Sequence, residues 1–211
     1  MFKNLSFDEL NALVKNERSM SFEKYFGEMS LPEEEKTKRI KMAEELEENF
    51  IVTMTLLFTM AQANKTDYEL IRKQIEDSYL ETLKKHTSVD KYLETYVKSF
   101  SYDVIDSTKS HKNEPYYYSL DRARFMAENE VNTAINHVRY QEAVNAGKTM
   151  KRWESIIDEV TRKDHREING KYIPIGQAFH VGDSWMMHAK DTSLGASANQ
   201  IVNCRCVTIY L

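Results

Sequence analysis

Two short motifs in the last third of the chain contain histidine and cysteine, side chains that can bind metal ions, at spacings that would align each pair on one face of an element. Arg162 and His165 are three residues apart, so on a helix they would share one face. Cys204 and Cys206 are two residues apart, so in a strand they would share one face. Thiolate and imidazole are groups that zinc prefers. Two such pairs from distant segments could therefore assemble a zinc site in a small module.

The zinc interpretation leaves the fourth ligand open. Arginine stays protonated and cannot bind a metal ion, so the protein ligands that remain are His165, Cys204 and Cys206. A water, His180 or His188 would then complete the tetrahedron. Zinc is one interpretation of this cluster, and a protein without any cofactor is the other.

The metal-free interpretation is a packed polar network. In it an arginine pairs with an aspartate, and both cysteines are small buried side chains; the candidates are Arg162 or Arg205 with Asp158 or Asp164. None of the signatures GxSxG, HExxH, GxxxxGK[ST] or GxGxxG occurs in the chain. A Cys–His nucleophile pair has only scattered histidines to support it. The sequence therefore predicts a protein that is not an enzyme.

Composition restricts the class of protein further. The 211 residues are 41% hydrophobic, which is enough for a buried core, and the net charge of −4 excludes a generic polyanion binder. The start MFKNLSFDEL lacks the pattern of a secretory signal. The longest apolar run, at residues 50–63, is shorter than the roughly 20 residues of a membrane span. The run predicts a buried helix and no membrane partner.

Glycine placement and capping patterns predict an α+β fold. Gly27 is the only glycine before residue 147, which predicts a helical front and a turn-rich back. Helix starts are expected at Ser6-x-x-Glu9 (a helix over 6–18), Ser30-x-x-Glu33, Thr66-x-x-Glu69, Ser88 and Ser119, with a loop at 107–118. Short extended stretches and one short helix near 162–167 follow Gly147. The predicted divisions are a helical arm or bundle at 1–118, a lead-in helix at 119–147, and a small α+β module at 148–211.

A series of landmark residues runs through the second half of the chain. They are Glu130, Ala134 and Asn136, then Gly147, Lys151 and Trp153, then Asp158, Arg162, His165, Ile168 and Gly170, then Phe179, Val181 and Gly182, then Asp191, Ser193, Gly195 and Ala196, and last Asn203-Cys204-Arg205-Cys206. In this order and spacing, residues 119–208 resemble the phage minor head protein family typified by the F protein of phage Mu, also called the head morphogenesis family. The region 1–118 shows no landmark of that family.

This resemblance implies a structural or morphogenetic component of a tailed phage or prophage head. Such proteins are minor capsid components that associate with portal and capsid proteins and with packaged double-stranded DNA. Their expected location is inside the virion head, and the host cytoplasm during assembly. Many relatives carry Cys-x-x-Cys where this chain has Arg162-x-x-His165, which implies a four-cysteine zinc site in those relatives. Because this chain departs from that ligand set, the resemblance implies only that the two segments meet in space.

Two alternative functions remain open. One is a DNA-binding module without a head role, and the other is a toxin or effector enzyme, because modules of this family are sometimes fused to such domains. Basic side chains slightly outnumber acidic ones at the start of the predicted module. The candidate phosphate contacts are Lys148, Lys151, Arg152, Lys163 and Arg166. Such a mild patch predicts weak, salt-dependent contact, or simply a solvated loop face.

Overall fold

The computed structural model describes residue 2, residues 5–14 and residues 19–211. Contacts within the chain define two compact units. The first, called the helical unit here, comprises Met1–Ser21 and Lys41–Glu128. The second, called the NCRC unit after the sequence at 203–206, comprises Phe22–Ile40 and Asn129–Leu211. Long helices in the first part of the sequence and short antiparallel strands in the last part confirm the α+β class.

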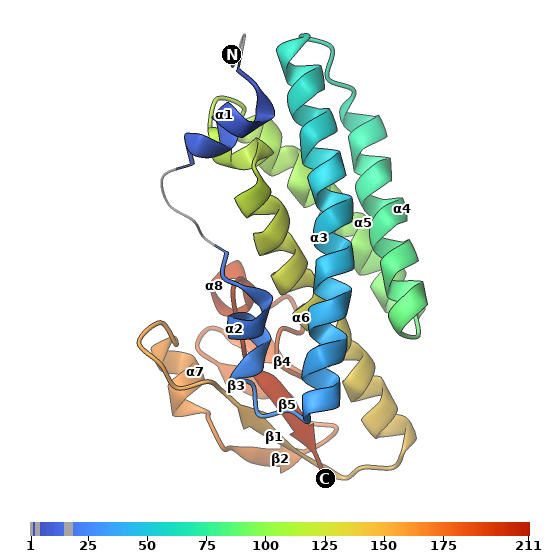
Figure 1. Cartoon of the computed structure of the whole chain (residues 1–211). Coiled ribbons are helices and arrows are strands. Elements are labelled where there is room, and N and C mark those ends of the chain that lie inside the picture. Colours follow the sequence, from blue (N-terminus) through green and yellow to red (C-terminus); the bar gives the residue numbers. More distant parts are fainter. Residues whose placement is uncertain (1, 3–4, 15–18) are drawn as a thin grey trace. The chain divides into compact units, whose positions relative to one another are not determined.

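The helical unit is built around long amphipathic helices. Its elements are α1 (Phe7–Ala12), most of α3 (Glu33–Gln62), α4 (Tyr68–His86), α5 (Lys91–Ser110), the 3-10 turn η1 (Pro115–Tyr118) and the start of α6 (Leu120–Asn145). Within this unit α3, α4 and α5 lie side by side (Figure 1). Their shared core includes the rings of Phe50, Tyr79 and Phe100, whose centroids lie 5.7–6.2 Å apart.

A buried arginine joins α5 to the beginning of α6. The guanidinium of Arg122 donates to the hydroxyls of Thr108 and Ser107 and to the carbonyl oxygens of Val104 and Tyr117, at 2.7–3.0 Å. Burial lowers the pKa of Arg122 to about 10, which still leaves the group charged at neutral pH. These four bonds replace the water that the charge loses.

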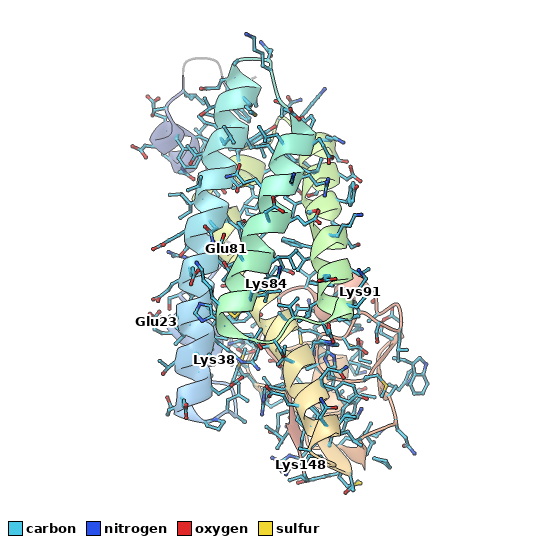
Figure 2. The ribbon with its side chains drawn as sticks, turned by 90° about the vertical axis from the view of Figure 1, so that its right-hand side faces the viewer. Glu23, Lys38, Glu81, Lys84, Lys91 and Lys148 are labelled. Atoms are coloured by element: carbon cyan, nitrogen blue, oxygen red, sulfur yellow. The ribbon has the colours of Figure 1, made fainter. Side chains whose placement is uncertain are left out.

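The outer faces of α4 and α5 are charged. Figure 2 shows Glu81 and Lys84 on α4 and Lys91 at the start of α5, and all three side chains are exposed. In the predicted apolar run, Phe50, Met54, Leu57 and Phe58 are buried, whereas Val52 is 59% exposed. Most other residues of the run are buried or half-buried, so the run is a helix segment buried on most faces, as the sequence predicts. Among the described residues, no helix is long and apolar enough to cross a membrane.

Several predicted helix boundaries need correction. The capping box at Ser6 and Glu9 is confirmed, but α1 ends at Ala12, and residues 15–18 of the predicted helix lie outside the described residues. The cap of α4 is Asp67 and not Thr66. The cap of α5 is Asp90 and not Ser88.

The predicted loop at 107–118 is also wrong. Helix α5 continues to Ser110, and Pro115–Tyr118 forms a 3-10 turn. The helix α2 (Phe22–Gly27) lies in a region for which no helix was predicted. Its aromatic side chains are buried, so tertiary packing stabilises a helix that is too short to be stable alone.

The NCRC unit combines helices with two small sheets. Its elements are α2, the first turns of α3, the rest of α6, β1 (Met150–Glu154), α7 (Lys163–Glu167), β2 (Tyr172–Pro174), β3 (Phe179–Val181), β4 (Ser184–Met186), α8 (Ala198–Ile201) and β5 (Val207–Tyr210). One sheet has the order β2-β1-β5 with antiparallel pairing, and β3 and β4 form a hairpin. Gly147, with φ at +70°, follows the end of α6 as predicted.

The core of the NCRC unit surrounds Trp153. Side chains of β1 alternate between buried and half-buried, so Trp153 points inward, where the ring of Phe179 lies 5.2 Å away. Cys204 and Cys206 belong to the same hydrophobic cluster. The three-part division predicted from the sequence, at 118 and 147, stays a prediction about which segments fold alone.

Candidate functional site

Segments distant in sequence bring His165, Cys204 and Cys206 together. The Nδ1 atom of His165 lies 3.2 Å from Sγ of Cys206 and 3.5 Å from Sγ of Cys204. All three side chains are buried. The expectation that the two cysteines share one face of a strand is wrong in its element, because β5 begins only at Val207. They lie instead in the irregular segment before β5, and the sulfur atoms still face the same imidazole.

A chain of two hydrogen bonds, through Gln200 to Asp164, fixes the orientation of the His165 imidazole. Its Nε2 lies 2.9 Å from Oε1 of Gln200, and Nε2 of Gln200 donates to Oδ2 of Asp164 at 2.9 Å. Because a carboxylate only accepts, the Gln200 amide must turn its nitrogen to Asp164 and its oxygen to His165. The histidine therefore carries a proton on Nε2, and Nδ1 faces the sulfur atoms.

The side chain of Ser155 supports the same cluster from β1. Its hydroxyl donates to the carbonyl oxygen of His165 at 2.9 Å and accepts from Nε1 of Trp153 at 3.0 Å. The Ser155 oxygen also lies 3.2 Å from Sγ of Cys206. Since the one hydroxyl proton is already used, the Cys206 thiol is the donor in that contact.

The two cysteines differ in acidity. Burial opposes ionisation of Cys204, but hydrogen bonds with Cys206 and His165 outweigh it and hold the pKa of Cys204 well below its ordinary value. Burial, together with the neighbouring Cys204, raises the pKa of Cys206. Burial would lower the pKa of His165, but its hydrogen bond and charge interaction with Cys204 raise it. The cluster therefore makes the two thiols unequal, with Cys204 the more acidic of the pair.

Asparagines on α6 hold the backbone of the cysteine segment. Asn132 donates to the carbonyl oxygen of Cys204 at 2.9 Å, and Asn136 donates to that of Cys206 at 3.2 Å. The Oδ1 atom of Asn129 accepts the backbone N–H of Asn203 at 2.6 Å. Spacings of three and four place these asparagines on one helix face. The predicted landmark Asn136 is thus a backbone clamp.

Arg39, near the start of α3, completes this clamp. Its guanidinium donates to Oδ1 of Asn132 and, at 3.1 Å, to Oδ1 of Asn136, which leaves both amide nitrogens free to donate to the segment. Arg39 is fully buried, and burial lowers its pKa to about 10, while the ion pair with Glu35 at 3.0 Å opposes the shift. The hydroxyl of Tyr25 donates to the Cys204 carbonyl as well, at 3.1 Å.

The predicted arginine–aspartate pairing is present in one of its forms. Arg205 pairs with Asp158 and lies 3.4 Å from Glu28. Arg162 is the N-cap residue of α7 and donates to the carbonyl oxygen of Val202 at 2.7 Å. Because it precedes the first turn, Arg162 does not share a helix face with His165 in the way the spacing suggested.

A cavity of about 140 Å³ adjoins the sulfur atoms. Its lining includes His165, Cys204, Cys206, Arg162 and Asn203. Asn203 has a positive φ of 53°, and among the described residues its Oδ1 is buried without a hydrogen-bond partner. The residues that line the cavity therefore carry sulfur, imidazole, guanidinium and amide groups.

The predicted fourth ligands do not join this group. Among the described residues, the candidate ligand atoms within 4.8 Å of one another come from His165, Cys204 and Cys206. His180 instead stacks on Trp185, with ring centroids 4.5 Å apart. The ring of His188 lies 5.6 Å from that of His137. Neither histidine has to complete a metal site, since water can take the fourth position.

The predicted DNA contacts divide into exposed and buried residues. Lys148, Lys163 and Arg166 are exposed, and Figure 2 shows Lys148 just beyond the end of α6. Arg152 is half-buried and bonds to the hydroxyl of Tyr172 at 2.6 Å. Lys151 is fully buried and donates to the carbonyl oxygen of Met187. We therefore correct the assignment of Lys151, because its ammonium cannot reach a phosphate from the core.

The remaining landmarks occupy structural positions. Glu130 is buried in α6, and the ring of Phe179 packs against Trp153. Gly170 has a φ of +77° and donates its N–H to the carbonyl oxygen of Trp153 at 2.8 Å. A side chain at Gly182 would overlap the carboxylate of Asp164 and the amide of Gln200. Gly182 thus gives room to the hydrogen-bond chain that orients His165.

Sequence reasoning missed several residues of this site. Gln200, Asn129, Asn132, Arg39 and Tyr25 were not predicted to take part. For the asparagines a signal did exist, because three amides recur at helical spacing within a stretch of α6 that is buried on every side. No comparable pattern distinguishes Arg39 or Gln200 from other polar residues on short or charged helices.

Comparisons with known proteins agree with the landmark residues. A family model described as Phage Mu protein F like protein matches residues 58–209, so the likeness also takes in α4 and α5, before the predicted start at 119. The NAD(+)–arginine ADP-ribosyltransferase EFV of Enterococcus faecalis is 38% identical over 72 residues, which are 33% of this chain and 14% of that protein. The chain thus spans a small part of that relative. No solved structure matches. Because the family model covers well over half of the residues, the chain belongs to the Phage Mu protein F like family.

Proposed function

We propose that the protein is a minor head protein of a tailed phage or prophage, associated with the portal and with packaged DNA. The observation that carries this proposal is the family match over residues 58–209, which supports a part in phage head morphogenesis. The clamp of α6 asparagines on the NCRC segment supports a structural role for the family's landmark residues. The proposed location is the virion head, after assembly in the host cytoplasm.

Co-purification with the portal protein of the same phage genome tests this role. The tagged full chain is expressed together with the portal protein, and separately with the major capsid protein. We expect a stable complex with the portal that survives size-exclusion chromatography. Recovery of the chain free of both partners, together with normal heads from a phage that lacks it, would contradict the proposal.

DNA contact without a head role is the second candidate. The exposed Lys148, Lys163 and Arg166 support a weak phosphate-binding face. Because such contact is electrostatic, binding to duplex DNA should fall steeply between low and physiological salt. Binding that persists at physiological salt, in a chain that ignores the portal, would favour this candidate over the first.

The effector alternative has one observation in its favour, the partial match to a relative named as an arginine ADP-ribosyltransferase. That name describes the relative, and the matched residues are 14% of its length. We propose that this chain is not a transferase. Incubation with labelled NAD(+) and an arginine-containing acceptor protein should leave the acceptor unlabelled, and time-dependent labelling would overturn this view.

A further inference from the structure

Three side chains of the two types that zinc prefers, imidazole and thiol, converge at one buried point of the NCRC unit. We propose that His165, Cys204 and Cys206 bind one zinc ion, with a water molecule as the fourth ligand. This inference does not rest on the proposed head role. It decides between the two interpretations that the sequence left open, a zinc site and a metal-free polar network.

The distances between the ligand atoms suit a tetrahedral ion. Bonds of about 2.3 Å to sulfur and 2.0–2.1 Å to nitrogen place tetrahedral ligand atoms roughly 3.5–3.8 Å apart. The observed separations from Nδ1 of His165 are 3.2 Å to Cys206 and 3.5 Å to Cys204. All ligand atoms of the group lie within 4.8 Å of one another. The two separations from Nδ1 therefore need to change by only a few tenths of an ångström to suit an ion.

The histidine presents the correct nitrogen. A ligating histidine commonly donates its other N–H to a second side chain, which fixes the tautomer and the ring. Here Gln200 accepts from Nε2, and Asp164 in turn accepts from Gln200. The lone pair of neutral His165 is then on Nδ1, facing both sulfur atoms. Zinc binding to this group would release the protons that the two thiols carry.

The sulfur atom of Cys204 also has the surroundings of a metal-bound thiolate. The backbone N–H of Cys206 points at Sγ of Cys204, with a separation of 3.4 Å. Arg162 lines the adjoining cavity, and Arg205 lines it as well. Donated hydrogen bonds and nearby cations favour the charged form of sulfur. The bound group carries no net charge, because the two thiolates balance the zinc ion and the imidazole is neutral. The group can therefore be buried without a further counterion.

The cavity supplies room on the fourth side. About 140 Å³ of space adjoins the group and is ample for a water molecule. Asn203 lines this cavity, and among the described residues its Oδ1 is a buried acceptor without a partner. Bound zinc would then join α7 to the segment that leads into β5.

Metal content and cobalt substitution test the site on the full chain. Protein expressed with zinc in the medium and purified without chelator should contain about one equivalent of zinc. Replacement by Co²⁺ should give the intense visible bands of a tetrahedral ion and a near-ultraviolet thiolate-to-cobalt band. Zinc-free protein with freely reactive thiols, or a chain in which Cys204 and Cys206 form a disulfide, would overturn the proposal.

Matched variants identify the ligands. Cys204→Ser and Cys206→Ser should each lose the metal, whereas His180→Ala, at an exposed histidine considered from the sequence as a fourth ligand, should keep it. Gln200→Ala retains all three ligands but frees the imidazole, so zinc affinity should fall about tenfold or more. If the serine variants fail to fold, the cobalt spectrum of the unmodified chain decides. A tetrahedral spectrum without thiolate bands, or zinc retained in both serine variants, would refute the assignment.

Discussion

Buried polar residues define the geometry of the NCRC unit at the scale of single side chains. Apolar packing around Trp153 has no direction, so it cannot by itself fix which backbone atoms face each other. Asn132 and Asn136 do so, because each amide both accepts from Arg39 and donates to a backbone carbonyl. A network in which every member is satisfied specifies one arrangement, and loss of one member leaves the others unpaired.

Removal of one clamp amide should be costly. Asn136→Ala leaves the carbonyl oxygens of Ala189 and Cys206 and one nitrogen of Arg39 without their partner. We expect the free energy of unfolding to fall by about 2–4 kcal/mol, measured by urea denaturation. Asn145→Ala, at an exposed asparagine at the end of the same helix, should change it by less than about 0.5 kcal/mol. Equal effects of the two substitutions would refute the clamp.

Alanine substitutions at three glycines can distinguish the cost of a strained backbone from the cost of steric overlap. Gly176→Ala meets neither a positive φ nor a neighbour and should be nearly neutral. Gly170→Ala meets only the positive φ of 77° and should cost about 1–2 kcal/mol. Gly182→Ala meets a positive φ and overlaps Asp164 and Gln200, so it should cost about 3 kcal/mol or more. Thermal denaturation of the three variants gives the order, and a Gly182 variant as stable as the Gly170 variant would exclude the overlap.

The buried Lys151 should make stability depend on pH. Burial lowers its pKa from an ordinary 10.5 to about 8, although Asp191 opposes the shift. Between these values the unfolded chain binds a proton that the folded chain does not, so the free energy of unfolding should rise with pH from about 8 to about 10. The rise should be smaller in Lys151→Met. Urea titrations across this range measure the difference between the two slopes, and parallel slopes would contradict it.

At the scale of helices and strands, caps show where sequence patterns mislead. The pattern at Ser6-x-x-Glu9 predicts a real capping box. The patterns at Thr66 and Ser88 lie close before Asp67 and Asp90, whose carboxylates accept the first N–H groups of α4 and α5 instead. Both residue types cap well, so spacing alone cannot choose between adjacent candidates.

The start of α5 can be tested by a pair of substitutions. Asp90 accepts the N–H of Leu93 at 2.9 Å, so Asp90→Ala should lower the free energy of unfolding by about 1 kcal/mol. Ser88→Ala should have almost no effect, because Ser88 lies outside the helix. Chemical denaturation followed by circular dichroism compares them. A larger decrease in the free energy of unfolding for Ser88→Ala than for Asp90→Ala would show that Ser88 is the cap, as the sequence predicts.

The site was partly predictable from the sequence. The meeting of His165 with Cys204 and Cys206 could be anticipated, since thiol and imidazole pairs at regular spacing suggest one cluster. The strand expected at the cysteines was wrong. Apolar residues on both sides of the cysteines make the sequence before β5 resemble a longer strand, but the backbone carbonyls of Cys204 and Cys206 accept hydrogen bonds from asparagines of α6 instead. Arg39 and Gln200 act only through tertiary contacts, and a single sequence carries no local signal for those.

At the scale of the whole molecule, each compact unit is assembled from separate stretches of chain. The NCRC unit needs Phe22–Ile40 in addition to Asn129–Leu211. The earlier stretch supplies Tyr25 and Arg39, which bond to the Cys204 carbonyl and to the α6 asparagines. A fragment that begins at the predicted lead-in helix would therefore contain every landmark residue yet lack part of the clamp.

Two truncations distinguish a composite unit from one that folds from its C-terminal stretch alone. Both tryptophans of the chain, Trp153 and Trp185, lie in the NCRC unit, so their fluorescence reports on its unfolding. Removal of residues 1–21 takes nothing from that unit and should leave the urea midpoint nearly unchanged. Removal of residues 1–40 leaves the amide oxygens of Asn132 and Asn136 without Arg39, so the midpoint should drop sharply or the transition disappear. An unchanged midpoint after the longer truncation would show that residues 129–211 fold without the earlier stretch. Arg39 and Tyr25 would then be dispensable, because burial around Trp153 would suffice to hold residues 203–206 in place.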